Sequence, residues 1–136
     1  MRFQMSVGDP SGDGHSQCDY FIIETNADNI DAVNSAYNKA VKKTKLDLVA
    51  SVCESYEENT ISKANVKILA KHGINIEDYC CDLDFMKEGD DYAPANDLWP
   101  ILVCDFIRIG NPALTFKVLE EDQFPKFDGG GYGLFF

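Results

Sequence analysis

Positive charge is scarce in this chain of 136 residues. Only 12 Lys and Arg residues accompany 23 Asp and Glu residues, so the formal net charge is −11. Proteins that bind nucleic acid through its phosphates concentrate Lys and Arg, and anionic membrane surfaces attract the same side chains. We therefore expect neither a direct nucleic-acid partner nor a membrane partner.

Long apolar runs are also lacking. The longest nearly apolar window, 98–109, is interrupted by Asp105 and Arg108 and is far shorter than a membrane span of roughly 20 residues. Residues 1–5 contain one positive charge with no apolar stretch behind them, which argues against a signal peptide. These absences predict a cytoplasmic protein.

Signatures of disulfide frameworks and of common catalytic sites are missing as well. The five cysteines are odd in number, irregularly spaced and without a CxxC pair, so we expect free thiols, with Cys53 and Cys104 buried as small hydrophobes. The chain contains no GxSxG, no HExxH and no Walker A lysine. His15 and His72 are the only histidines, so a histidine-dependent mechanism would need one of them.

Alternating apolar residues predict strands at both ends of the chain. Residues 1–8 and 19–25 fit two strands that pair antiparallel across the loop 8–17, which is rich in Gly, Asp and Ser. Residues 114–118 alternate in the same way, and the aromatic tail 132–136 is a candidate partner for that strand.

Apolar residues at helical spacing predict helices between these strands. The first helix follows a cap at Asn26 or Asp28 and ends in lysines, which complement the helix dipole. A second helix is expected over 62–72, with Gly73 as a left-handed C-terminal cap.

The remaining helix and two irregular stretches complete the prediction. Residues 96–109 fit a helix with Pro100 in its first turn, where proline is tolerated. Residues 46–56 fit either a strand or a short helix, and 77–92 suit a long surface connection. The order of elements favours an α+β fold in one domain, 1–136: a small, mostly antiparallel sheet with about three helices packed on one face, forming a two-layer sandwich.

The loop before the second strand has the most specific pattern in the chain. Asp9, Ser11 and Asp13 occupy alternate positions, and Gly14 follows. This spacing resembles the first half of the DxDxDG loop of EF-hand proteins, in which alternate oxygens bind calcium and glycine allows a sharp turn. The resemblance implies a Ca²⁺ or Mg²⁺ site that uses these side chains and the residue after the glycine, His15.

Two other interpretations of this loop stay open. An EF-hand needs a bidentate acid at the twelfth position, where Tyr20 stands, and the candidate acid Asp19 is one residue early. The loop is also typical of a structural turn in which Asp and Ser side chains cap backbone amides. In a third interpretation, successive N–H groups around Gly12 and Gly14 bind an anionic ligand.

The C-terminal tail combines a glycine run with aromatic residues. Glycines 129–131 allow close approach of the backbone to a ligand, so Gly130 and Tyr132 are candidate ligand-binding residues, with the tyrosine ring stacking on the ligand. Alternatively, the tail closes the core or contacts a second copy of the chain in a homodimer.

These observations favour a non-enzymatic binding or interaction protein that takes a small-molecule ligand or a protein partner at the N-terminal loop. One alternative is a metal-dependent hydrolase of a phosphoester or nucleotide, with Asp9 and Asp13 as metal ligands and His15 as base or ligand. A second alternative is an acidic inhibitor that mimics nucleic acid and occupies a basic groove on a partner, since acids cluster in 54–58, 82–91 and 120–122.

Overall fold

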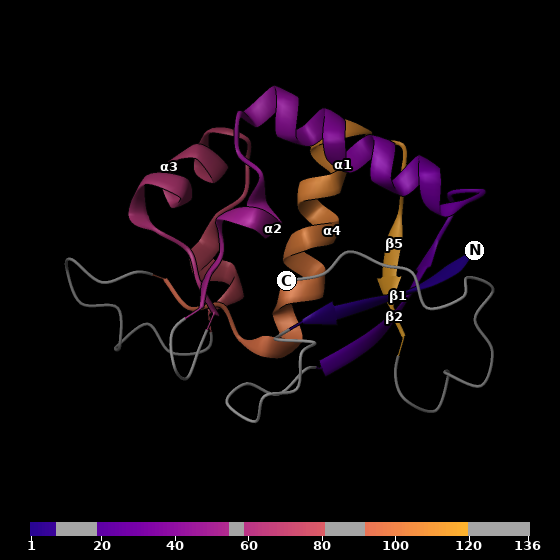
Figure 1. Ribbon diagram of the computed structural model, residues 1–136, viewed down its shortest axis with the longest axis horizontal. Helices are drawn as coiled ribbons and strands as arrows, with labels where there is room; N and C mark the ends of the chain where they lie inside the picture. The colour runs from indigo at the N-terminus through magenta and orange to yellow at the C-terminus, as the bar shows by residue number, and fades with distance from the viewer. Residues whose placement is uncertain (8–18, 55–58, 81–91, 120–136) are drawn as a thin grey trace.

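The computed structural model describes residues 1–7, 19–54, 59–80 and 92–119 of the chain (Figure 1). The α-helices in these ranges are α1 (Ile30–Thr44), α2 (Leu48–Ser51), α3 (Lys63–Lys71) and α4 (Trp99–Gly110). The strands are β1 (Arg2–Val7), β2 (Asp19–Thr25), β3 (Cys53–Glu54), β4 (Asn59–Thr60) and β5 (Phe116–Val118). Two short 3-10 helices are η1 (Ile76–Tyr79) and η3 (Asn96–Leu98).

The main sheet is antiparallel and places β2 between β1 and β5. Phe3 lies opposite Ile23, and Ile23 lies opposite Val118, so these apolar side chains share one face. The predicted pairing of the first two strands is confirmed, and the strand expected at 114–118 is β5. Its expected partner, 132–136, lies outside the described residues.

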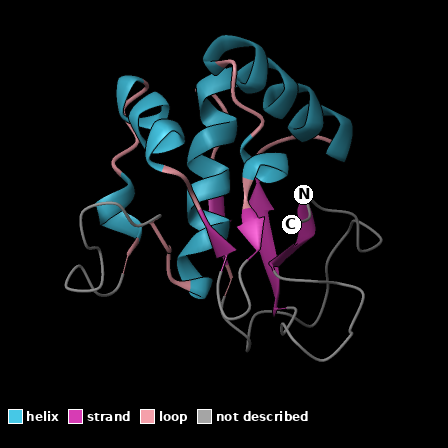
Figure 2. Ribbon diagram, turned by 60° about the vertical axis from the view of Figure 1, so that its left-hand side comes forward, coloured by secondary structure: helices cyan, strands magenta, loops and turns pink. Residues whose placement is uncertain are grey.

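Helix α4 packs on the face of the sheet that carries these apolar side chains, where it contacts β1 and β5, whereas α3 contacts η1. Helix α4 lies beside the sheet, and α1 crosses over α4 (Figures 1 and 2). Phe3 and Phe106 are fully buried in this core; the ring of Phe3 meets Phe116 edge-on at 6.4 Å, and that of Phe106 lies 5.4 Å from Tyr37. The prediction of a small α+β fold is confirmed.

The crossing of α1 and α4 depends on small residues. A Cβ atom added to Gly110 would lie 1.9 Å from the carbonyl oxygen of Ala36 and 2.8 Å from the amide nitrogen of Ala40. The end of α4 therefore rests directly on the backbone of α1, which only glycine permits.

The helix ends correct one prediction and confirm another. The N-cap of α1 is Asn29, whose Oδ1 accepts a hydrogen bond from the amide of Ala32 at 2.9 Å, and neither Asn26 nor Asp28 takes that position. After α3, Gly73 has a φ of +87°, so the predicted left-handed residue is present. Asn26 is diverted to another role, because its side chain bonds to the segment that leads into β5.

Two stretches had weak sequence patterns, and the structure assigns secondary structure to parts of both. The ambiguous stretch 46–56 contains both alternatives in succession, the single helical turn of α2 and then β3, which pairs with β4. The stretch 77–92 was expected to be irregular, but its start belongs to η1 and Tyr92 forms a β-bridge with Ile61. Tertiary contacts therefore order the two ends of that stretch.

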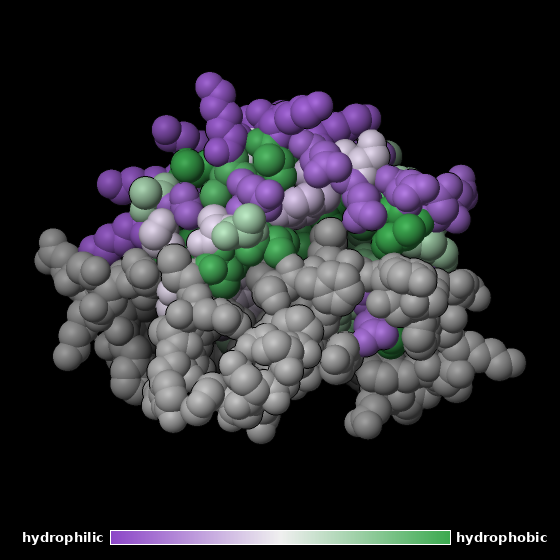
Figure 3. Space-filling view, viewed as in Figure 1, coloured by the Kyte–Doolittle hydropathy of each residue, from purple (hydrophilic) through white to green (hydrophobic). Residues whose placement is uncertain are grey.

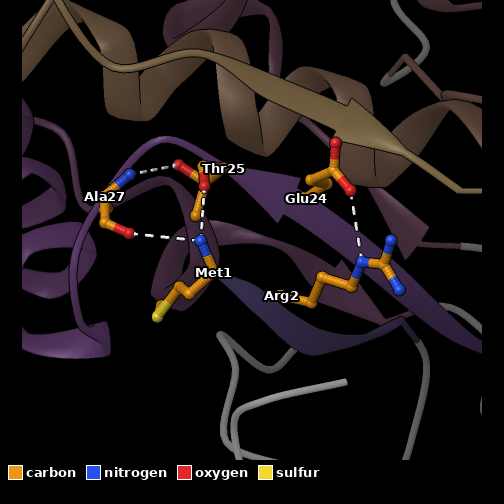
Figure 4. Close-up of polar contacts among 5 residues, drawn as sticks. All are labelled: Met1, Arg2, Glu24, Thr25 and Ala27. Atoms are coloured by element: carbon orange, nitrogen blue, oxygen red, sulfur yellow. Dashed lines mark hydrogen bonds and ion pairs between the residues drawn. The ribbon is translucent and has the colours of Figure 1, made fainter. Parts of the chain in front are cut away.

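Hydrogen bonds from Met1 join the start of β1 to the segment that follows β2. The amine of Met1 donates hydrogen bonds to the carbonyls of Thr25 at 2.7 Å and Ala27 at 3.4 Å (Figure 4). Next to it, Nε of Arg2 donates to the Glu24 carboxylate at 3.1 Å. These contacts fix the turn from which α1 begins.

None of the described helices has both the length and the apolar character needed to cross a membrane.

Candidate ligand-binding groove

Most residues predicted from the sequence to form a site lie outside the described ranges. These are Asp9, Ser11, Gly12, Asp13, Gly14, His15, Gly130 and Tyr132. Asp19 is the first residue of β2 and lies opposite Val7, although only its backbone is described. The metal site and the ligand site of the N-terminal loop and tail therefore remain predictions. Among the residues that the structure does describe, no three His, Cys, Asp or Glu side chains are grouped to hold a metal ion.

A different site is visible between α4 and β5. The two elements border a groove of about 510 Å³, within the range of about 300–1,000 Å³ that is usual for small-ligand sites. Its lining combines apolar side chains with an acid, a base and a hydroxyl: Ile101, Cys104, Asp105, Arg108, Thr115, Phe116 and Val118.

Helical periodicity explains why α4 contributes to this groove. Ile101, Asp105 and Arg108 follow one another at intervals of four and three residues, which places them on one face of the helix. Helix α4 and β5 run in opposite directions and are joined by a short connection (Figure 1). Arg108 therefore lies toward Thr115, and Ile101 toward Val118. Ile101 is 40% exposed and is the large hydrophobic residue left open among the described residues.

Asp105, the acidic residue of the groove, accepts a hydrogen bond from a tyrosine outside the groove lining. The Oη atom of Tyr79 in η1 donates to Oδ2 of Asp105 at 2.5 Å. Burial, followed by the contact with this carboxylate, raises the pKa of Tyr79 above its ordinary value. One oxygen of Asp105 is thus occupied by a neutral phenol, and the carboxylate is fixed in place.

Arg108, the basic residue of the groove, lies at the C-terminal end of α4. Arg108 is in the last turn of α4, where a positive charge complements the helix dipole. Its Nη2 donates to the carbonyl of Pro112 at 3.4 Å, which is a long contact. The guanidinium retains donors for a ligand, because it has five N–H groups.

Cys104 contributes bulk to the groove and no reactive thiolate. The residue is only 4% exposed, as expected for a small buried hydrophobe. Burial, and the nearby Asp105 carboxylate to a lesser extent, raise the pKa of the thiol well above its ordinary value. The thiol therefore stays protonated at neutral pH and is a poor nucleophile.

Asn26 sets the position of the β5 end of the groove. Its Nδ2 donates to the carbonyl of Ala113 at 3.0 Å, and its Oδ1 accepts from the amide of Thr115 at 2.9 Å. These two bonds continue the β2–β5 ladder through a side chain. A smaller recess of about 290 Å³ lies beside them, lined by Asn26, Thr115, Phe116 and other residues of β2 and β5.

This groove was not predicted from the sequence, although the sequence contains one signal for it. Asp105 and Arg108 interrupt the most apolar stretch of the chain, and their spacing places them on the same helix face as Ile101. What the sequence could not supply was the neighbour of that face, since the position of β5 depends on its pairing with β2.

Comparisons with known proteins found no protein family, no curated protein and no solved structure that matches this chain.

Proposed function

We propose that this chain is a non-enzymatic binding protein and that the groove between α4 and β5 holds its ligand. The observation that carries the proposal is the mixed lining of the groove. Apolar surface from Ile101, Phe116 and Val118 lies beside a fixed carboxylate and a guanidinium. Binding sites typically combine an apolar surface with a few placed polar groups that fix the orientation of the ligand.

The chemistry of the groove supports binding more than catalysis. A nucleophile or general base needs a pKa near the working pH, and the pKa of Cys104 and that of Tyr79 are both raised away from neutrality. Asp105 accepts its bond from this protonated phenol. The charged side chains of the groove, Asp105 and Arg108, can orient a ligand by charge and hydrogen bonds.

The N-terminal loop is retained as a separate candidate binding site, as the sequence predicts, and we propose that Ca²⁺ or Mg²⁺ stabilises it. A thermal melt followed by circular dichroism, with millimolar calcium, magnesium or EDTA, tests this part separately. We expect a higher melting temperature with the metal than with EDTA. An unchanged melting temperature would remove the metal from the proposal. A cytoplasmic location belongs to the same proposal and rests on the odd, irregularly spaced cysteines.

The test of the groove is a fragment screen read by amide chemical shifts. Small molecules that pair an apolar group with a charged or amide group are added to ¹⁵N-labelled protein. We expect saturable shifts at residues 101–108 and 115–118, and their loss in Ile101→Asp, which changes an exposed side chain of the groove. Ala64→Asp is the matched control, because Ala64 is exposed on α3.

The outcomes of this screen separate the alternatives. Shifts that survive Ile101→Asp would exclude the groove as the site. Saturable shifts centred on residues 9–15 would assign binding to the N-terminal loop in its place.

A further inference from the structure

We infer that the ligand of the α4–β5 groove is an extended peptide that adds to the edge of β5 and carries an apolar–acidic–apolar triplet. This inference rests on the proposed binding function and specifies its ligand. Three features support it: the orientation of the β5 backbone, the side chains on its two faces, and the positive charge of Lys117.

The first feature is the hydrogen-bonding pattern of β5. Within the described part of the chain, the sheet order is β1-β2-β5, so β5 is an edge strand there, and the peptide would compete for this edge with the predicted partner strand 132–136. The amide of Leu119 donates to the carbonyl of Ile22 at 2.9 Å. Because antiparallel strands turn alternate residues toward the same neighbour, Lys117 also faces β2, while the amides and carbonyls of Phe116 and Val118 face away from it.

A peptide strand can use these outward groups directly. In strand addition, backbone bonds to a sheet edge provide affinity, and pockets for alternate side chains provide specificity. The outward amides and carbonyls of Phe116 and Val118 provide the bonds, and the groove borders the same strand. Both requirements of this binding mode are therefore met at β5.

The second feature decides which peptide fits. Guest residues opposite Phe116 and Val118 would point to the same side of the sheet as these two side chains, which is the side of the groove and of Ile101. Those two guest positions should be apolar. The guest residue between them would lie opposite Lys117 on the exposed face, where Arg2 and Lys117 flank Glu24 and leave this row of side chains with one positive charge in excess. An acidic residue there pairs with the lysine.

The third feature argues against a second copy of this chain as the guest. Two copies could pair their β5 strands antiparallel, with Phe116 of each copy opposite Val118 of the other. In this arrangement Lys117 of one copy would lie opposite Lys117 of the other. Like charges in directly opposite positions destabilise a strand pair. Charge complementarity at Lys117 therefore favours a different, acidic strand.

The probe is a blocked pentapeptide with the sequence threonine-valine-glutamate-valine-threonine. Its matched control contains lysine in place of glutamate. Both are titrated to millimolar concentration into ¹⁵N-labelled protein, with amide shifts as the readout. We expect saturable shifts at 115–118 and 101–108 with the glutamate peptide, and about fivefold weaker binding of the lysine peptide.

Two variants make the test specific. Lys117→Glu should reverse the preference between the two peptides, a result that loss of folding cannot produce. Val118→Pro removes an outward amide and leaves the bonds of Lys117 and Leu119 to β2 in place, because proline is tolerated on an edge strand when its nitrogen faces away from the sheet. We expect it to abolish binding of both peptides while the signals of α1 stay unchanged.

Failure of this inference can be told apart from failure of the proposed function. If fragments bind the groove and neither peptide does, the groove is a ligand site and the peptide inference is wrong. If light scattering shows a dimer that Val118→Pro dissociates, the edge belongs to a second copy and the inference is also wrong. Equal binding of both peptides to wild type would remove the acidic preference.

Discussion

Gly110 and Asn26 each fix how two elements of secondary structure lie against each other. Gly110 ends α4 against the backbone of α1. Asn26 joins the end of β2 to the segment before β5 through two side-chain hydrogen bonds. The first position requires the absence of a side chain, and the second requires one particular side chain, so each can be tested by a small substitution.

Gly110→Ala should destabilise the fold by about 3 kcal/mol, because the new methyl group would meet the backbone oxygen of Ala36 and force the helices apart. Gly73→Ala is the control: its Cβ would have open space, and only the positive φ costs energy, about 1 kcal/mol. Urea unfolding of the wild type and of the two variants measures the difference in the free energy of unfolding. Equal losses for both variants would contradict the close approach of α4 to α1.

Asn26→Ala should lower the free energy of unfolding by about 2 kcal/mol, because two hydrogen bonds to residues 113 and 115 are lost. Asn26→Asp keeps the acceptor for the Thr115 amide and should lose less. Asn34→Ala, at an exposed position on α1, should change the unfolding free energy by under about 0.5 kcal/mol. If Asn26→Ala behaves like Asn34→Ala, the side-chain bridge does not stabilise the fold.

At the scale of elements, two tyrosines connect short helices to long ones. Tyr79 of η1 donates to Asp105 of α4. Tyr37 of α1 donates to the Asp47 carboxylate at 2.6 Å and accepts from the amide of Val49 at 2.9 Å, which fixes the start of α2. Helices of four residues are too short to be stable alone, so these contacts are what hold them.

Tyr79→Phe should therefore accelerate hydrogen exchange locally. We expect faster exchange at the amides of residues 78–80, next to the lost bond to Asp105, and unchanged exchange in α2. Tyr37→Phe is the reciprocal control and should affect α2 without affecting η1. Uniform acceleration over the whole chain would mean that the two short helices are not separately attached.

At the scale of the whole molecule, the negative charge is unevenly distributed. The described residues contain ten Lys and Arg and ten Asp and Glu, so they are neutral together, and the remaining segments carry the net charge of −11. Seven of the ten basic residues lie in the second half of α1, at its C-cap or in α3: Lys39, Lys42, Lys43, Lys45, Lys63, Lys67 and Lys71. Hydrophilic side chains cover the side of the molecule where these helices lie (Figure 3). The charge that argues against phosphate binding is thus a property of the other segments.

Stability should fall in alkaline solution. Burial raises the pKa of Tyr37, Tyr79 and Cys104 above their ordinary values of about 10, 10 and 9. Above pH 9 the unfolded chain releases these protons while the folded chain retains them, so the folded state loses stability as pH rises. The slope approaches about 1.4 kcal/mol per pH unit for the buried thiol of Cys104 and is smaller for the two tyrosines, which solvent partly screens.

Urea unfolding between pH 8 and pH 11 measures this dependence, and Tyr79→Phe should make it shallower because one titrating group is removed. A free energy of unfolding that stays constant or rises over this range would show that these groups are not protected from ionisation by the fold.

The sequence alone determined those parts of the protein that depend on local chemistry. The helix over 62–72 with Gly73 after it, the start of α4 around Pro100 and the first strand pair follow from periodicity, turn residues and backbone geometry within a few neighbours. The prediction for Asn26 failed because a nearby cap position competed with two partners that are 87 and 89 residues away in the sequence.

Only the tertiary structure decided the groove. Asp105 and Arg108 are visible in the sequence as polar residues in an apolar helix, but nothing near them indicates that β5 lies beside that face. The pairing of β5 with β2 brings residues 116–118 to residues 23–25, and Tyr79 reaches Asp105 from another part of the chain. Such contacts depend on how the hydrophobic core closes, and the core is a property of the whole chain.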